Sequence, residues 1–132
     1  MSTLNRSIVA AAATLILGAC VPVRVRMADP TLPRASICPE AVTTFATPAE
    51  VGKGYVEVAQ LSAGPFGAHF VPSTWKVEEA KRKKAAQLGA NGIILRHALG
   101  GRELLYDDVV AIFIPADSAR AAEVCAAARG RE

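Results

Sequence analysis

No apolar run in this chain approaches the ~20 residues that a membrane-spanning helix requires. Aromatic residues make up only 5% of the 132 residues, and histidine occurs just twice. The net charge of +3 is too weak to indicate nucleic-acid binding. With 52% apolar and 20% charged residues, the composition also excludes a disordered charged tail and a collagen-like repeat. The length fits one modest domain.

The usual signatures of catalysis are also missing. No GxGxxG or phosphate-binding loop occurs, and no serine stands in a nucleophile-elbow sequence. Asp107 and Asp108 are adjacent, so on a strand they would point to opposite faces, and they are better explained as turn residues. His69 and His97 have no second ligand at metal spacing. We therefore predict no enzyme activity, no catalytic residue, no metal site and no cofactor.

The first 19 residues have the three-part layout of a secretory signal. Arg6 gives a positive start, and residues 8–17 form an apolar stretch. The sequence Leu17-Gly18-Ala19-Cys20 then matches a bacterial lipobox, in which the cysteine thiol receives diacylglycerol before cleavage. We therefore predict a lipoprotein signal peptide over 1–19 and lipidation of Cys20. An uncleaved amphipathic helix is the alternative explanation of this segment.

The residue after the lipidated cysteine bears on the predicted address. Several acyl chains, such as palmitate, make membrane anchoring stable, because each buried methylene contributes ~0.8 kcal/mol. Val21 rather than aspartate follows Cys20, which favours the outer membrane over the inner membrane. The predicted localisation is therefore the bacterial cell envelope, with the domain facing the periplasm.

With Cys20 assigned to lipid, Cys38 and Cys125 remain as a candidate pair in an oxidising compartment. A bond between positions 38 and 125 would close a long loop, which stabilises the fold by about 4–5 kcal/mol in the chain-entropy model. A redox-active pair is disfavoured, because the chain has no Cys-x-x-Cys spacing. The sequence favours a structural disulfide and leaves two unpaired thiols as the alternative.

Prolines at positions 22, 30, 33 and 39 interrupt the segment after the lipobox. Because proline fixes φ and removes a backbone donor, we predict an extended tether over residues 20–40. At ~3.1 Å per residue it would lift the domain some tens of ångströms from the membrane. Its arginines, Arg24, Arg26 and Arg34, either contact anionic headgroups or are simply solvated.

The folded domain is expected over residues 41–128, followed by a tail at 129–132. Runs of β-branched and apolar residues predict strands at 42–45, 54–61, 92–98 and 109–114. Residues 62–72, which include His69, and residues 99–108 are punctuated by glycine, proline or aspartate and are expected to be connections.

Two helices complete the predicted domain. The first covers residues 74–88, with Ser73 or Thr74 as its cap and Gly89 as its stop. The second, capped by Asp117 or Ser118, covers about residues 118–128. The order strand-strand-helix-strand-strand-helix predicts a small α+β domain, with a mostly antiparallel sheet and the helices on one face.

The first predicted helix concentrates basic charge, since residues 76–84 carry five basic and two acidic side chains. Two i,i+4 ion pairs are expected, Glu78 with Arg82 and Glu79 with Lys83. Lys81 and Lys84 fall within the apolar face, where their stems would cover the sheet while their ammonium groups reach water. This helix either docks an acidic partner or lipid, or presents a solvated surface.

The junction that follows this helix resembles that of a known family. Residues 84–95 read KAAQLGANGIIL, similar to the A-A-x-x-G-A-N-A-(V/I)-(V/I) junction of small bacterial envelope proteins. These include the outer-membrane lipoproteins that sense envelope stress for the Rcs phosphorelay, and YbjQ-like domains described as heavy-metal binding. The physical logic of the junction is local. Gly89 allows positive φ, Ala90 lets the strand leave close to the helix, and Asn91 can bond the turn backbone.

The resemblance implies a shared fold and compartment rather than a site. Ala98 stands where the Rcs lipoproteins carry a cysteine, and one cysteine pair is available here in place of two disulfides. We expect a non-enzymatic envelope lipoprotein, an interaction or stress-sensing module anchored through Cys20, with an envelope protein as partner and no nucleic acid. The alternative is a periplasmic binder of a metal ion or small ligand, with His69 and His97 as ligands. A hydrolase built around residues 62–72 is a third, weaker candidate.

Overall fold

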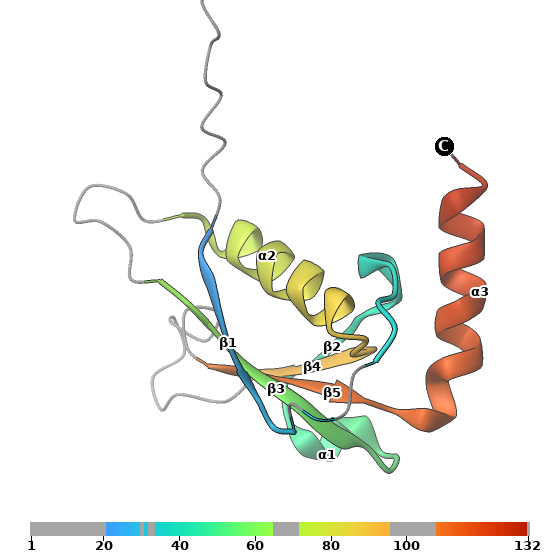
Figure 1. Cartoon of the computed structure of the whole chain (residues 1–132), viewed down its shortest axis with the longest axis horizontal. Coiled ribbons are helices and arrows are strands. Elements are labelled where there is room, and N and C mark those ends of the chain that lie inside the picture. Colours follow the sequence, from blue (N-terminus) through green and yellow to red (C-terminus); the bar gives the residue numbers. More distant parts are fainter. Residues whose placement is uncertain (1–20, 30, 32–33, 65–71, 96–107, 132) are drawn as a thin grey trace, which may run out of the picture.

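The computed structural model describes residues 21–29, 31, 34–64, 72–95 and 108–131 of the chain. Within these ranges, five strands form one open sheet in the order β1-β3-β5-β4-β2, accompanied by three helices (Figure 1). The strands are β1 (Val23–Met27), β2 (Thr43–Phe45), β3 (Val56–Ala63), β4 (Gly92–Leu95) and β5 (Val109–Phe113). The helices are α1 (Pro48–Val51), α2 (Thr74–Gln87) and α3 (Ser118–Arg129), with 3-10 turns η1 (Pro39–Ala41) and η2 (Pro115–Asp117).

The pairing of the strands is mostly antiparallel, as the sequence predicted. β3 pairs antiparallel with β1 and β5, and β5 pairs antiparallel with β4. Among the described strands, only the short β2 runs parallel to its neighbour, β4. The two most apolar strands, β4 and β5, are therefore inside the sheet, where both of their faces must be covered. The α+β class is confirmed.

The two faces of the sheet are covered by different helices. On one face, Ala85 and Ala86 of α2 pack against Leu61, Ile93 and other core residues. On the opposite face, Val51 of the four-residue α1 joins Ile94 and other buried residues of β4 and β5. The expectation that all helices lie on one face is therefore wrong. Successive residues of β4 and β5 point to opposite faces of the sheet, and those on both faces are apolar. Helix α1 covers the face that α2 leaves open.

The predicted tether over residues 20–40 is contradicted by β1. Val23–Met27 pairs along its whole length with β3, from Val23 opposite Ala63 to Met27 opposite Ala59. Val23 and Met27 pack against the core under α2, while the intervening arginines are exposed. The prolines at 22 and 30 flank the strand and so remove no ladder donor from it. The sheet domain therefore begins at Val23 rather than at residue 41.

The second half of the predicted tether also lies against the domain. The Ile37 N–H donates to the Ala86 carbonyl over 2.9 Å, at the C-terminal end of α2. The Arg34 guanidinium stacks over the Phe113 ring, 4.1 Å from its centroid. Arg34 is therefore held against β5, whereas Arg24 and Arg26, nearer to Cys20, are exposed on β1.

The junction of Gly89, Ala90 and Asn91 shows a structural reason for each residue. Gly89 has φ +75°, and a Cβ there would lie 2.5 Å from the Arg34 Cβ. Ala90 is completely buried between helix and strand. We had expected the Asn91 side-chain amide to bond the backbone of the turn, but it bonds Ile114 instead. Its nitrogen donates to the Ile114 carbonyl over 2.9 Å, and its oxygen accepts from the Ile114 N–H over 2.7 Å, so it fastens the end of β5.

Helix α2 agrees with its prediction in extent and ion pairs. It runs over Thr74–Gln87, although Ser73 makes no side-chain capping bond. Glu78 pairs with Arg82 at 3.1 Å, and Glu79 with Lys83 at 2.8 Å. The expected exposure of the Lys81 ammonium is wrong, because the whole residue is 0% exposed. It lies one helical turn from Val77 and from Ala85, in the middle of the buried stripe.

Among the described helices, none is long and apolar enough to cross a membrane.

Helix α3 stands beside the sheet rather than on either face (Figure 1). Its buried residues, Ala121 and Cys125, pack against Ala41, with Ile37 nearby. Asp117 sits at its N-cap position without a capping bond and forms an ion pair with Lys53 instead. The helix continues through Arg129, which the sequence had placed in the tail.

Candidate functional site

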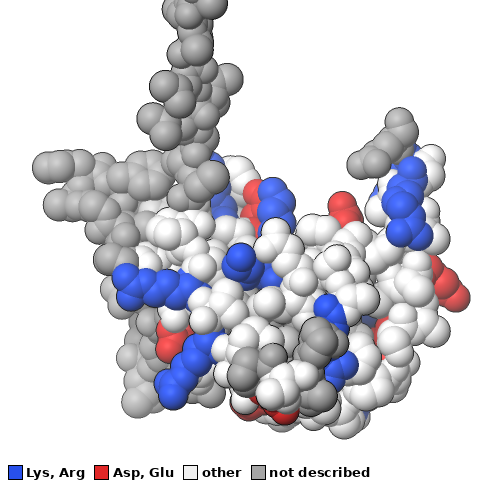
Figure 2. Space-filling view, in the orientation of Figure 1, with Lys and Arg blue, Asp and Glu red and all other residues white. Residues whose placement is uncertain are grey.

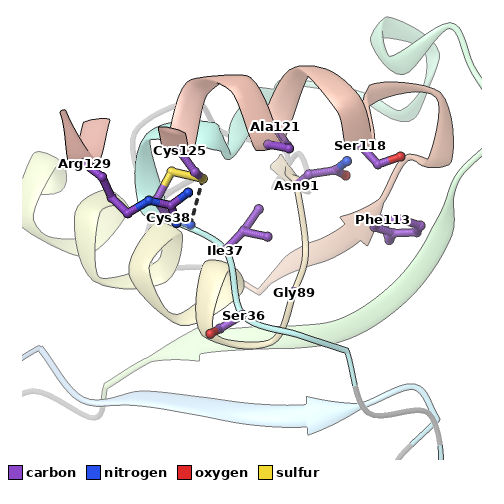
Figure 3. A pocket seen from close by; sticks show the side chains of 11 residues that line it. Ser36, Ile37, Cys38, Gly89, Asn91, Phe113, Ser118, Ala121, Cys125 and Arg129 are labelled. Atoms are coloured by element: carbon purple, nitrogen blue, oxygen red, sulfur yellow. Dashed lines mark hydrogen bonds between the residues drawn. A yellow bond between two sulfur atoms is a disulfide. The ribbon is translucent and has the colours of Figure 1, made fainter. Parts of the chain in front are cut away.

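A pocket of about 350 Å³ lies where α3 meets the segment before η1 and the helix–strand junction. Its walls come from three parts of the chain that are distant in sequence (Figure 3). Residues 36–38 form one wall, Gly89 and Asn91 a second, and Phe113 of β5 with one side of α3 a third. The volume falls at the low end of the range typical of small-ligand sites.

The Cys38–Cys125 disulfide forms one end of this pocket. The two sulfurs are 2.12 Å apart and the Cα atoms 5.5 Å apart, over a sequence separation of 87 residues. The Cys38 N–H also donates to the Cys125 Sγ over 3.1 Å, drawn as the dashed line in Figure 3. The bond joins α3 to the segment that enters η1, and so fixes the width of the pocket.

The polar groups that line the pocket are few and mostly engaged. Both polar atoms of the Asn91 side chain bond to Ile114. The Ser118 hydroxyl donates to the Pro115 carbonyl. Ser36 and Arg129 are exposed, and Arg129 reaches the pocket from the C-terminal end of α3 (Figure 3). Among the described residues that line the pocket there is no carboxylate, histidine or free thiol, so no such base or acid stands beside the hydroxyls of Ser36 and Ser118.

The remainder of the lining is apolar. Ile37, Phe113 and Ala121 present hydrocarbon surface next to the disulfide. A short apolar side chain would therefore be accommodated, with Arg129 available for a neighbouring acidic group.

Several residues singled out from the sequence are not brought together by the described structure. Cys20, His69, His97 and Asp107 lie outside the described residues, as do 99–107 of the predicted connection. Asp108 is exposed. Within the described ranges, no group of three or more His, Cys, Asp or Glu residues could hold a metal ion.

Other residues of the pocket were missed in the sequence. Arg129 had been placed in the tail, and Ile37 in the tether. Phe113 was recognised only as part of a strand. No local pattern marks any of the three, because the pocket forms only when α3 returns to the residues before η1.

The resolved pKa shifts among the described residues lie on the surface, away from the pocket. The Lys83 ammonium donates to Glu79, which lowers the pKa of Glu79 and raises that of Lys83. The hydroxyl and N–H of Thr31 donate to Asp29 and lower its pKa. These shifts describe local surface pairs and mark no catalytic group.

Comparison of the chain with protein-family models, with curated proteins and with solved structures gave no match. The function is therefore argued from the residues and the geometry alone.

Proposed function

We propose that the chain is a non-enzymatic lipoprotein of the bacterial envelope, anchored through Cys20, whose small domain is an interaction or stress-sensing module. The observation that carries the proposal is the use of the three cysteines. Cys38 and Cys125 are joined in the folded domain, and such bonds persist in oxidising compartments outside the cytosol. The remaining cysteine stands at the end of a lipobox. Both the secretory signal and the structural disulfide support a location outside the cytosol.

The pocket supports an interaction role over a catalytic one. Its apolar lining lies beside the disulfide, and its one charged group is Arg129. An apolar side chain of a partner protein, with an acidic group next to it, matches this chemistry. The partner would contact α3, much of whose surface consists of exposed alanines and arginines.

The anchor is tested by mass spectrometry of the protein recovered from cell envelopes. We expect an N-terminal peptide that begins at Cys20 and carries diacylglycerol and an acyl chain, together with incorporation of labelled palmitate. Incorporation should disappear in Cys20→Ala. An intact chain that begins at Met1 in the cytosol would refute the anchor, as would labelling that persists in Cys20→Ala.

The interaction role is tested by photocrosslinking in intact cells. A photoreactive residue at Ala122, which lines the pocket, is compared with one at Ala127, which is exposed on the same helix but does not line it. We expect one envelope protein to crosslink at position 122 and not at position 127. Equal crosslinking at the two positions, or none at position 122, contradicts a partner at the pocket.

A binder of a small ligand remains the second candidate, because the pocket volume of about 350 Å³ suits a small molecule. The alternative ligand is a metal ion held by His69 and His97. Calorimetric titration of the exported protein with divalent cations tests this alternative. Heat release together with a raised unfolding midpoint would favour it, and a flat titration would remove it.

A further inference from the structure

One end of the domain gathers the features of a membrane-facing surface. The β1 strand begins there, with Val23 opposite Ala63 at the end of β3. The Gly64 N–H donates to the Pro22 carbonyl over 3.1 Å, which holds the incoming chain against β3. Helix α2 also begins at this end (Figure 1), and Trp75 and Lys76 belong to its first turn. We call Arg24, Trp75 and Lys76 the docking end.

The pairing of β1 leaves almost no chain between the predicted lipid and the sheet. Only Val21 and Pro22 separate Cys20 from Val23. Even fully extended, the three residue steps from Cys20 to Val23 span only about 10 Å. The tether expected from the prolines would have allowed tens of ångströms. An acyl chain on Cys20 therefore holds the start of β1 against the bilayer surface.

The aromatic residue at this end is unusually exposed for its size. Trp75 is 61% exposed, the largest exposure among the big apolar side chains of the described residues. The Lys76 ammonium lies 5.6 Å from the centre of its ring. A tryptophan next to a basic side chain is typical of the membrane–water interface, where the ring enters the headgroup layer and the cation stays at the phosphates.

The charges at this end are available for a partner. Farther along α2, Arg82 and Lys83 are paired with glutamates. Within the described residues, Lys76 and Arg24 form no ion pair. Arg24 is exposed and stands opposite the neutral Ser62. Figure 2 shows basic side chains on this face of the molecule, some projecting from the side on which β1 lies and others from α3.

We propose that the docking end lies on the surface of an anionic bilayer, with Trp75 in the headgroup layer and Arg24 and Lys76 on lipid phosphates. The proposal deepens the proposed function, since the lipid on Cys20 supplies the proximity. It names the lipid surface itself as a partner of the domain and fixes which end of the sheet faces it. The α3 pocket is then left open to the periplasm.

The chain contains a single tryptophan, so its fluorescence reports on Trp75 alone. The full lipidated protein is reconstituted into vesicles of phosphatidylethanolamine with phosphatidylglycerol, and into vesicles of phosphatidylcholine only. We expect a blue-shifted emission, quenched by lipids brominated near the headgroup, in the anionic vesicles alone. Sodium chloride at about 1 M, where the Debye length is about 3 Å, should reverse the shift while the protein still floats with the vesicles.

The charge contacts are tested by two double variants of equal net charge. Arg24→Gln with Lys76→Gln alters the docking end. Lys53→Gln with Arg120→Gln is the control, because Lys53 precedes β3 at its opposite end and Arg120 lies on α3. We expect the equilibrium constant for docking to fall about fivefold for each cation removed from the docking end, and to stay unchanged in the control.

The outcomes separate this proposal from the anchor. Protein that floats with both vesicle types but keeps a solvent-like Trp75 emission overturns the docking and leaves the anchor intact. Protein without lipid on Cys20 overturns the anchor, and a Trp75 shift that it still shows on anionic vesicles upholds the docking. A shift that is equal on neutral vesicles, is lost equally in the control variant, or requires another envelope protein overturns the lipid surface as the partner.

Discussion

The two ends of the described chain are attached to the sheet in opposite ways. β1 is held by a ladder of backbone pairing along five residues, with arginines on its outer side. α3 has no backbone ladder and is held by small side chains, by its connection to β5 and by one covalent bond. Stability at the first end is spread over many weak contacts, whereas at the second it is concentrated in a few. The two ends should therefore respond differently to single changes.

The largest effect is expected from the disulfide. Replacing Cys38 and Cys125 together by alanine should lower the free energy of unfolding by about 2–5 kcal/mol, as measured by urea denaturation. Hydrogen exchange should show the amides of α3 losing protection first, because Ala121 alone then remains as a buried anchor.

Amides of β1 serve as the internal control in that experiment. They should keep their protection relative to β3 in the double variant. Equal loss of protection in β1 and α3 would show that the two ends are not independent, and would contradict the comparison.

The next effect is expected at the joint between β5 and α3. Asn91→Ala should lower the free energy of unfolding by about 2–3 kcal/mol, because it leaves the buried N–H and carbonyl of Ile114 without their partner. Thermal unfolding measures the change. Gln87→Ala, at an exposed site on the preceding helix, should shift the midpoint little. A similar shift in both variants would show that the Ile114 contacts contribute nothing particular.

A smaller effect is expected in β1. Met27→Ala should cost roughly 1 kcal/mol, because Met27 is only partly buried and its site can be reached by water. Exchange protection should fall in β1 and leave α3 unchanged. A loss of several kcal/mol, or loss of protection in α3, would mean that the edge strand is more tightly coupled to the domain than its packing suggests.

The smallest effect is expected on the surface of α2. The pKa of Glu79 is lowered by its bond to Lys83, so this pair stabilises the fold above the unfolded pKa and is lost as pH falls through the folded one. An NMR titration should give Glu79 a pKa below the ordinary value of 4.5, and the Lys83→Gln substitution should return the pKa towards that value. The unfolding midpoint should hardly change, since both groups are exposed. An unchanged Glu79 titration in Lys83→Gln would show that the pair is absent in solution.

The sequence predicted those parts of the fold whose signals are local. The run Ile93, Ile94 and Leu95 and the run 109–114 are continuous apolar stretches, and both became inner strands. The i,i+4 spacing on α2 was sufficient to predict its ion pairs. These features depend on neighbours within one element, so periodicity alone identifies them.

The features that were missed depend on long-range contacts. Val23–Met27 alternates valine with arginine, but the surrounding prolines outweighed that short signal, and only pairing with β3 makes it a strand. Lys81 was placed on the inner face, yet its complete burial depends on how α2 sits on the sheet. Asn91 was expected to bond the nearest backbone and instead bonds Ile114. The pocket could not be predicted, because it exists only between elements.

The 87-residue separation of the bonded cysteines sets the order in which the molecule can be completed. A chain on which residue 125 has not yet been made cannot close this bond. A free thiol at Cys20 would be much nearer to Cys38 along the chain and would compete for it kinetically. In the proposed lipoprotein the sulfur of Cys20 is joined to diacylglycerol through a thioether and can no longer form a disulfide. This lipidation would then act as a protecting group for correct oxidation.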